Sequence, residues 1–504
     1  MSTSSAAAAP SYTALEARFA QLSRLQDIAA MLQWDSAAMM PPGGAEARAE
    51  QLAQLKVMAH DLLTDARTGD LIAAADAEQG TLDDWQSANL AEIKRGYRRA
   101  VAVPADLVAA LSLACSRCET VWRKARPAGD FAMVLPAMAA QLRLVREQAQ
   151  ALAGALGLSP YDALLDGYEP DGRSAEIDVI FDDLAGFLPD FIEQALAHQA
   201  TKPAPRLLPG PFPVAAQRQL GLTLMAKLGF DFERGRLDTS LHPFCGGIPD
   251  DVRITTRYNE ADFMTSMMGV IHETGHALYE QGLPAAWRHQ PVGQSRGMSL
   301  HESQSLLAEM QAARSGEFLS FAAPLMRAAF GGTGAAWELD NIQRLYTRVA
   351  RGMIRVDADE ATYPAHVILR YRLERALIAG DLALPDLPAA WNAGMTELLG
   401  ITPADDREGC LQDIHWYDGA WGYFPTYTLG AMTAAQLFAA AEAAHPSLRS
   451  DLAKGDFSAL VGWLRRHIHG KASSRSTRQL LTEATGRPLD AGLFKAHLKH
   501  RYLS

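Results

Sequence analysis

Hydrophobic side chains recur every three or four residues along most of the chain, which is the spacing of helices that bury one face. In the segment 12–34 these positions are Leu15, Phe19, Leu22, Leu25, Ile28 and Leu32. The pattern continues to about Ala200 and returns from Met264 to the end of the sequence. We therefore predict a mainly α fold in which helices pack on helices.

One segment has the alternation of a β-strand instead. After a Gly-Gly and Pro-Asp turn, the alternating positions are Val252, Ile254, Thr256 and Tyr258. β-branched and aromatic residues at every second position are typical of a strand. The sequence thus predicts a small β-sheet directly before the helical pattern resumes at Met264.

Proline and glycine mark loops at residues 39–44, at 202–213 and near Gly331. We predict a single folded unit over residues 1–504. The loop near residue 205 could divide it into a helical lobe, 1–205, that covers a cleft, and a second lobe, 206–504, that carries the candidate catalytic residues described below.

Composition indicates an ordinary globular protein, with 48% hydrophobic and 21% charged residues among 504. The 58 acidic residues exceed the 47 basic ones, for a net charge of -11, so we expect no nucleic-acid and no membrane partner. The first residues lack a basic leader followed by an apolar run, and the apolar stretch 429–441 is too short to cross a bilayer. We expect a cytoplasmic protein.

Four cysteines are too few for a disulfide framework in a chain of this size. Cys115 and Cys118 form a CxxC pair inside an amphipathic helical pattern, without a second pair nearby. We interpret both as helix-face residues rather than a redox or metal pair.

The strongest chemical signal is VIHETGHALYEQG, residues 270–282. On a helix, His272 and His276 project from one face a turn apart, so both imidazoles can reach one Zn²⁺. Glu273 lies off that line, where a carboxylate can accept a proton from water at the metal. The motif is short enough to occur by chance, so its neighbours decide its meaning.

A catalytic zinc needs a third protein ligand. Glu280 lies eight residues from His272, about 12 Å along a helix, which is too far. A second predicted helix, GMSLHESQSLLAEM at 297–310, offers His301 and Glu302. The residues by themselves leave both open.

With these motifs in view, the chain resembles the carboxypeptidase Taq family (thermostable carboxypeptidase 1) of zinc metallocarboxypeptidases. The family's motifs occur in order as HPF (242–244), DVRIT (251–255), HETGH (272–276), HES (301–303), IRVDAD (354–359) and GCLQDIHW (409–416). Several motifs in one order are far more specific than any one of them.

The resemblance implies a helical metallopeptidase fold with a deep active-site cleft, and a homodimer. It implies Zn²⁺, with Co²⁺ as a substitute metal, held by His272, His276 and Glu302, and Glu273 as the catalytic carboxylate. The substrates would be peptides with a free C-terminus, shortened one residue at a time, with broad preference and poor action on proline.

An arginine fork suits the terminal carboxylate of a peptide. The candidates are Arg253 in the predicted strand and Arg355 in IRVDAD, and we favour Arg355 because Asp359 could orient it. As a whole we interpret the series Arg344, Arg348, Arg351 and Arg355 as a solvated helical face, from which Arg355 differs because it also matches the family motif.

The negative charge that develops on a carbonyl oxygen during hydrolysis can be stabilised by a tyrosine hydroxyl or a histidine. The segment 415–430 supplies His415 and Tyr423, which we predict to be catalytic as in related helical zinc peptidases, and Tyr427 as an alternate in the substrate site. Single aromatic residues are more often core or cleft lining.

Three other histidine positions are weaker candidates. His242 could bind substrate or fix the turn before the sheet, and His301 could bond to a ligand carboxylate. We interpret His467 and His469 as surface residues. Two other functions stay open: a helical zinc oligopeptidase or dipeptidyl carboxypeptidase, and a non-catalytic helical interaction protein.

Overall fold

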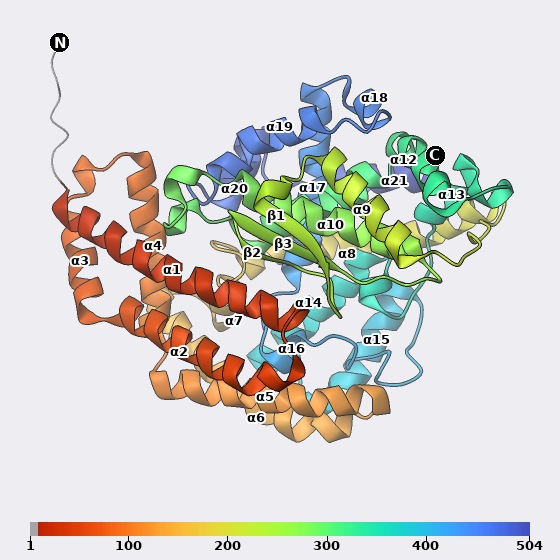
Figure 1. Ribbon diagram of the computed structural model, residues 1–504. Coiled ribbons are helices and arrows are strands. Elements are labelled where there is room, and N and C mark those ends of the chain that lie inside the picture. Colours follow the sequence, from red (N-terminus) through yellow and green to blue (C-terminus); the bar gives the residue numbers. More distant parts are fainter. Residues whose placement is uncertain (1–8) are drawn as a thin grey trace, which may run out of the picture.

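The computed structural model describes residues 9–504, and helices dominate it (Figure 1). The mainly α prediction is confirmed. Residues 1–8, which belong to the stretch that lacks a leader pattern, lie outside the described residues. Within 9–504 no single helix is long and apolar enough to cross a membrane, and one bent pair, Asp84–Ala102 with Ala105–Ala128, meets that criterion only when taken together.

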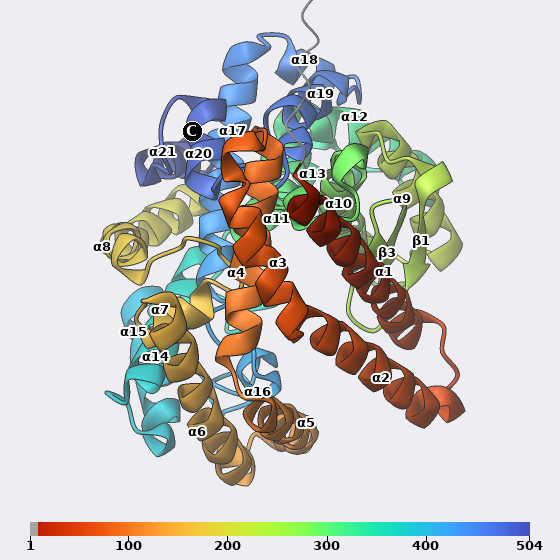
Figure 2. The same cartoon turned by 90° about the vertical axis from the view of Figure 1, so that its left-hand side faces the viewer.

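Eight α-helices come first in the part of the chain that the structure describes. They are α1 (Pro10–Ala38), α2 (Ala45–Thr64), α3 (Ala66–Ala77), α4 (Asp84–Ala102), α5 (Ala105–Ala128), α6 (Phe131–Leu156), α7 (Pro160–Leu165) and α8 (Ser174–Ala200). The predicted loops at 39–44 and 202–213 separate α1 from α2 and follow α8. Helices α5 and α6 run side by side at the edge of the molecule (Figures 1 and 2). The CxxC pair lies on α5, where Cys118 is buried and both thiols are free.

The predicted sheet is present and has three strands in the order β1-β3-β2. Strand β1 (Gly235–Thr239) is parallel to β3 (Asp251–Thr256), and β2 (Cys245–Ile248) is antiparallel to it. The sheet packs through Val252 and Ile254 onto α9 (Val214–Leu228) and α10 (Phe263–Gly282). It therefore supports the helix that carries the two histidines.

Helix α10 starts at the N-cap Asp262, whose side chain accepts a hydrogen bond from the Met264 amide at 2.8 Å. It packs closely on α11 (Met298–Leu306), and glycine makes this approach possible. A Cβ at Gly275 would lie 2.4 Å from the Gln304 carbonyl oxygen. Gly430 likewise allows α17 (Pro425–Ala444) to approach α11 closely, since a Cβ there would lie 2.9 Å from the Cβ of Glu302. The chain thus holds Glu302 between two close helices.

The remaining helices complete the main core. They are α12 (Gly316–Phe330), α13 (Leu339–Tyr346), α14 (Tyr363–Ala379), α15 (Leu387–Leu399), α16 (His415–Asp418), α18 (Leu448–Leu452), α19 (Ser458–His467), α20 (Thr477–Thr485) and α21 (Ala491–Leu503). The largest cluster of buried side chains runs from Val103 to Tyr502 and includes residues on both sides of residue 205. The single unit and its division into two lobes stay predictions.

Two local interpretations are wrong. The arginine series is not one helical face, because α13 ends at Tyr346 and only Arg344 lies on it. His469 is not a surface residue: it is 1% exposed, and its Nε2 lies 2.9 Å from the Gln304 side-chain oxygen. An interpretation from helical spacing alone overestimates the exposure of side chains that lie beyond the end of the helix.

Candidate metal centre and cleft

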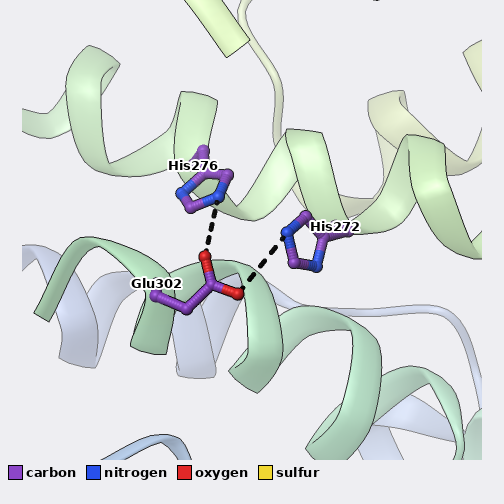
Figure 3. A group of neighbouring side chains, drawn as sticks. All are labelled: His272, His276 and Glu302. Atoms are coloured by element: carbon purple, nitrogen blue, oxygen red, sulfur yellow. Dashed lines mark ion pairs between the residues drawn. The ribbon is translucent and has the colours of Figure 1, made fainter. Parts of the chain in front are cut away.

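Three side chains from two helices converge beside the sheet. His272 and His276 project from α10, and Glu302 reaches toward them from α11 (Figure 3). Glu302 Oε1 lies 3.9 Å from His272 Nε2, and Oε2 lies 3.4 Å from His276 Nε2. One ligand atom from each residue lies within 4.8 Å of the others. Tetrahedral ligands with metal bonds of about 2.1 Å stand about 3.4 Å apart, so this set fits one zinc-sized ion.

Each histidine turns its Nε2 toward Glu302 and its Nδ1 toward another residue. His272 Nδ1 lies 3.0 Å from Glu309 Oε2, and His276 Nδ1 lies 2.7 Å from His301 Nδ1. His301 in turn lies 2.9 Å from Glu280 Oε1. His301 thus contacts a histidine of the candidate ligand set, not the Glu302 carboxylate, and Glu280 contacts His301 rather than the centre.

The charges around the centre favour a cation. Burial lowers the pKa of His272, but the carboxylates of Glu302 and Glu309 outweigh that effect and raise it to about 10. Burial raises the pKa of Glu273 to about 7, against the opposing charge of His272. Histidine nitrogens and a carboxylate are ligands that zinc accepts. The residues present therefore fit the implied metal.

A cleft of about 910 Å³ opens onto this centre. Its lining includes all three candidate ligands and Glu273. Of the other candidates from the sequence, His301, Arg355, Tyr423 and Tyr427 line it as well. The sequence prediction of these residues as one site is consistent with this placement.

Arg355 belongs to a buried charge network. Its Nε and Nη2 donate to Asp413 Oδ1 at 3.1 and 2.8 Å, and Arg370 Nε donates to Asp413 Oδ2 at 2.6 Å. The side chains of Arg355, Arg370 and Asp413 are 6%, 0% and 10% exposed. Burial alone would raise the pKa of Asp413, but the two guanidinium charges hold it well below its usual range. Two positive charges share one negative charge at the wall of the cleft.

The prediction that Asp359 orients Arg355 is wrong. Asp359 accepts hydrogen bonds from the backbone amides of Ala350, Ala361 and Thr362, and so closes the turn that follows Arg355. The partner is Asp413, which is distant in sequence and close only because of the fold.

Arg253 and His242 are not among the residues that line the cleft. Arg253 pairs with Asp251 on its own strand at 2.6 Å, and its guanidinium lies 4.6 Å from the ring centre of Trp34 on α1. His242 is exposed in the loop between β1 and β2. The structure brings neither to the centre, and their binding roles stay predictions.

Tyr423 and Tyr427 line the cleft, and His415 lies behind Tyr427. Tyr427 Oη lies 3.0 Å from His415 Nε2, and the ring centres of Tyr423 and Tyr427 are 5.2 Å apart. His415 is not among the lining residues, so it reaches the cleft through Tyr427. Burial raises the pKa of Tyr427 to about 12, and it raises that of Tyr423 further. Both hydroxyls are therefore protonated donors near neutral pH.

Sequence reasoning missed five residues of this site. They are Glu309, Arg314, Tyr363, Arg370 and Asp413. Asp413 lies inside the GCLQDIHW motif, and Glu309 follows Glu302 by about two helical turns, so both carried a usable signal.

Comparison with known proteins agrees with this geometry. Residues 14–502 match the model of the carboxypeptidase Taq (M32) metallopeptidase family. The chain is 39% identical over 488 residues to thermostable carboxypeptidase 1 of Thermus thermophilus, covering 95% of each chain. It is 34% identical over 487 residues to carboxypeptidase 1 of Bacillus subtilis, covering 96% of each.

Solved structures of related enzymes have the same fold. Metallocarboxypeptidase 1 of Trypanosoma cruzi superposes with a TM-score of 0.97 at 40% identity, covering 99% of this chain and 100% of that one. The M32 carboxypeptidase of Deinococcus radiodurans gives 0.91 at 35% identity, covering 98% of each. A match over nearly the whole length in both sequence and structure shows that the chain belongs to the carboxypeptidase Taq (M32) family of metallopeptidases and is a metallocarboxypeptidase, a peptide hydrolase.

Proposed function

We propose that the protein is a zinc carboxypeptidase that removes C-terminal residues one at a time, and that Arg355 binds the terminal carboxylate of the peptide. The observation that carries this proposal is the Arg355–Asp413–Arg370 network at the cleft wall. Its unbalanced positive charge is buried, and a buried charge is costly without a partner. The carboxylate at the end of a peptide would supply that partner.

The network also favours a carboxypeptidase over the oligopeptidase alternative. An internal peptide bond has no carboxylate to offer to Arg355, whereas each C-terminus does. Asp413 accepts hydrogen bonds from Nε and Nη2 of the Arg355 guanidinium. Nη1 and the second proton of Nη2 can then donate to the carboxylate of the substrate. Family membership already excludes the non-catalytic alternative.

His272, His276 and Glu302 would hold the zinc ion, which when bound polarises a carbonyl and lowers the pKa of water. Glu273 is positioned in the same cleft to accept a proton from water and to return it to the leaving amine. Burial raises the pKa of Glu273 above its ordinary value, which makes its carboxylate a stronger base than that of an exposed glutamate.

Tyr423 would donate a hydrogen bond from its hydroxyl to the carbonyl oxygen as negative charge develops there. Tyr427 Oη already contacts His415 Nε2 at 3.0 Å, so we assign the role of donor to Tyr423. His415 then acts by holding Tyr427 in place beneath Arg355, whose guanidinium lies 4.7 Å from the Tyr427 ring centre. In this proposal His415 positions Tyr427 and does not itself contact the reacting atoms of the substrate.

Broad preference at the cleaved residue is part of the proposal. The cleft includes Met264, Met268 and Met310, and methionine side chains adapt to partners of different shape. Poor action on proline, substitution by Co²⁺ and a homodimer are proposed on the resemblance alone.

The function is tested by following a free-acid peptide with the zinc-loaded protein by mass spectrometry. We expect successive loss of single residues, and loss of that activity after the metal is removed by a chelator. Glu273→Gln should retain zinc near the wild-type level and lose hydrolysis by about 10²-fold or more, because Glu273 moves protons without binding the ion. Release of dipeptides or internal fragments would reject the exopeptidase proposal.

A further inference from the structure

Glu309 is a buried carboxylate to which the proposed reaction assigns no task. It lies in a π-helical segment, Leu307–Ala313, that continues α11 directly beyond Glu302. Segments of π-helix are rare and often occur at functional sites. The residue is 8% exposed, and both of its oxygens have partners.

One partner is a candidate metal ligand and the other is an arginine. Glu309 Oε2 lies 3.0 Å from His272 Nδ1, and Arg314 Nη2 donates to Glu309 Oε1 at 2.8 Å. Arg314 Nη1 also donates to the Tyr346 carbonyl at 3.3 Å, which anchors the guanidinium on α13. Arg314, Glu309 and His272 thus form a continuous chain of contacts from the end of α13 to the candidate metal centre.

This chain of contacts fixes which nitrogen of His272 carries a proton. An ionised carboxylate only accepts hydrogen bonds, so Nδ1 must be the donor in its contact with Glu309. A histidine that binds a metal is neutral, so the lone pair of His272 as a ligand is on Nε2, the atom that faces Glu302 at 3.9 Å. Arg314 donates to Oε1 of Glu309, which leaves Oε2 to face His272 Nδ1.

We propose that Glu309 is a positioning residue for the metal site, held by Arg314, which fixes the orientation and tautomer of His272. The proposal rests on the proposed zinc function, since it assigns His272 as a ligand. Partners of this kind typically change metal affinity by about 10–100-fold when they are removed.

The test measures the zinc dissociation constant by competition with a chelator, for the wild type and for Glu309→Gln, Arg314→Met and the double variant. We expect Glu309→Gln to weaken zinc binding about 10–100-fold and Arg314→Met to weaken it less. If Arg314 acts through Glu309, the double variant should bind zinc as Glu309→Gln does. The visible absorption of the Co²⁺-loaded protein should change in Glu309→Gln, because the ligand geometry changes.

The control is Glu317→Gln, which removes another partly buried, ion-paired glutamate, the partner of Arg449 at 3.4 Å, without contact to the centre. It should bind zinc as the wild type does. Zinc binding by Glu309→Gln within twofold of the wild type would overturn the proposal, and additive losses in the double variant would overturn the role of Arg314. If Glu309→Gln fails to fold, Glu309→Asp keeps the charge but is one methylene shorter, and unchanged affinity there has the same meaning. A wild type that binds no zinc would instead refute the proposed function.

Discussion

Replacing Asp413 with asparagine should destabilise the protein far more than the loss of a surface charge. The substitution keeps the shape of the side chain but leaves Arg355 and Arg370 without their shared counterion, at sites 6% and 0% exposed. The asparagine oxygen can accept from one guanidinium, while its amide group faces the donors of the other. Removing one partner of a buried ion pair costs about 3–5 kcal/mol.

The loss should be visible in both chemical and thermal unfolding. For a chain of 504 residues the unfolding entropy is about 1 kcal/mol per degree, so the predicted loss corresponds to a decrease in Tm of about 3–5 °C. The matched control is Asp405→Asn, which removes an exposed pair with Arg407 at 3.0 Å. Surface pairs contribute about 0–1 kcal/mol. Equal stability of the two variants would refute the claim that Asp413 neutralises buried charge.

Three further predictions concern the centre, the tyrosine and the core. Glu302→Ala should lose bound zinc as measured by metal analysis, whereas His301→Ala should retain the ion with weaker affinity, and the reverse result would exchange their roles. Tyr423→Phe should decrease kcat about 10²-fold or more with little change in KM, since its hydroxyl acts mainly in the transition state, and an effect on KM alone would place it in substrate binding. Burial raises the pKa of Glu374 to about 7 from its ordinary 4.5, so the protonated form is favoured in the folded state. Unfolding free energy should therefore decrease by about 3 kcal/mol as the pH rises from 4.5 through 7, and Glu374→Gln should remove that decrease in denaturant titrations.

The sequence predicted what depends on local spacing. The four-residue step from His272 to His276 places both on one face of any helix, and the alternation at Val252 and Ile254 was sufficient to predict a strand. These features need no knowledge of the tertiary fold.

The partners of these residues depend on contacts between distant segments. Asp359 lies four residues beyond Arg355, which on a helix would place the two side by side, but the backbone turns there, and Asp413 contacts Arg355 from 58 residues away. His415 similarly has the right residue type for catalysis, yet Tyr427 stands between it and the cleft. Sequence spacing does not show which of two nearby side chains faces the substrate.

The most direct test of whether Arg355 binds the terminal carboxylate compares kcat/KM for one peptide as its free acid and as its C-terminal amide. The wild type should cleave the amide at least about 100-fold less efficiently, since hydrogen bonds to a charged group contribute about 1.5–3 kcal/mol each and Arg355 would lose its partner. Arg355→Lys should lose most activity on the free acid and most of this discrimination, because a point charge does not reproduce the guanidinium edge. Discrimination that survives in Arg355→Lys but vanishes in Arg253→Lys would move the clamp to the sheet. Equal cleavage of acid and amide by the wild type would contradict recognition of the terminal carboxylate.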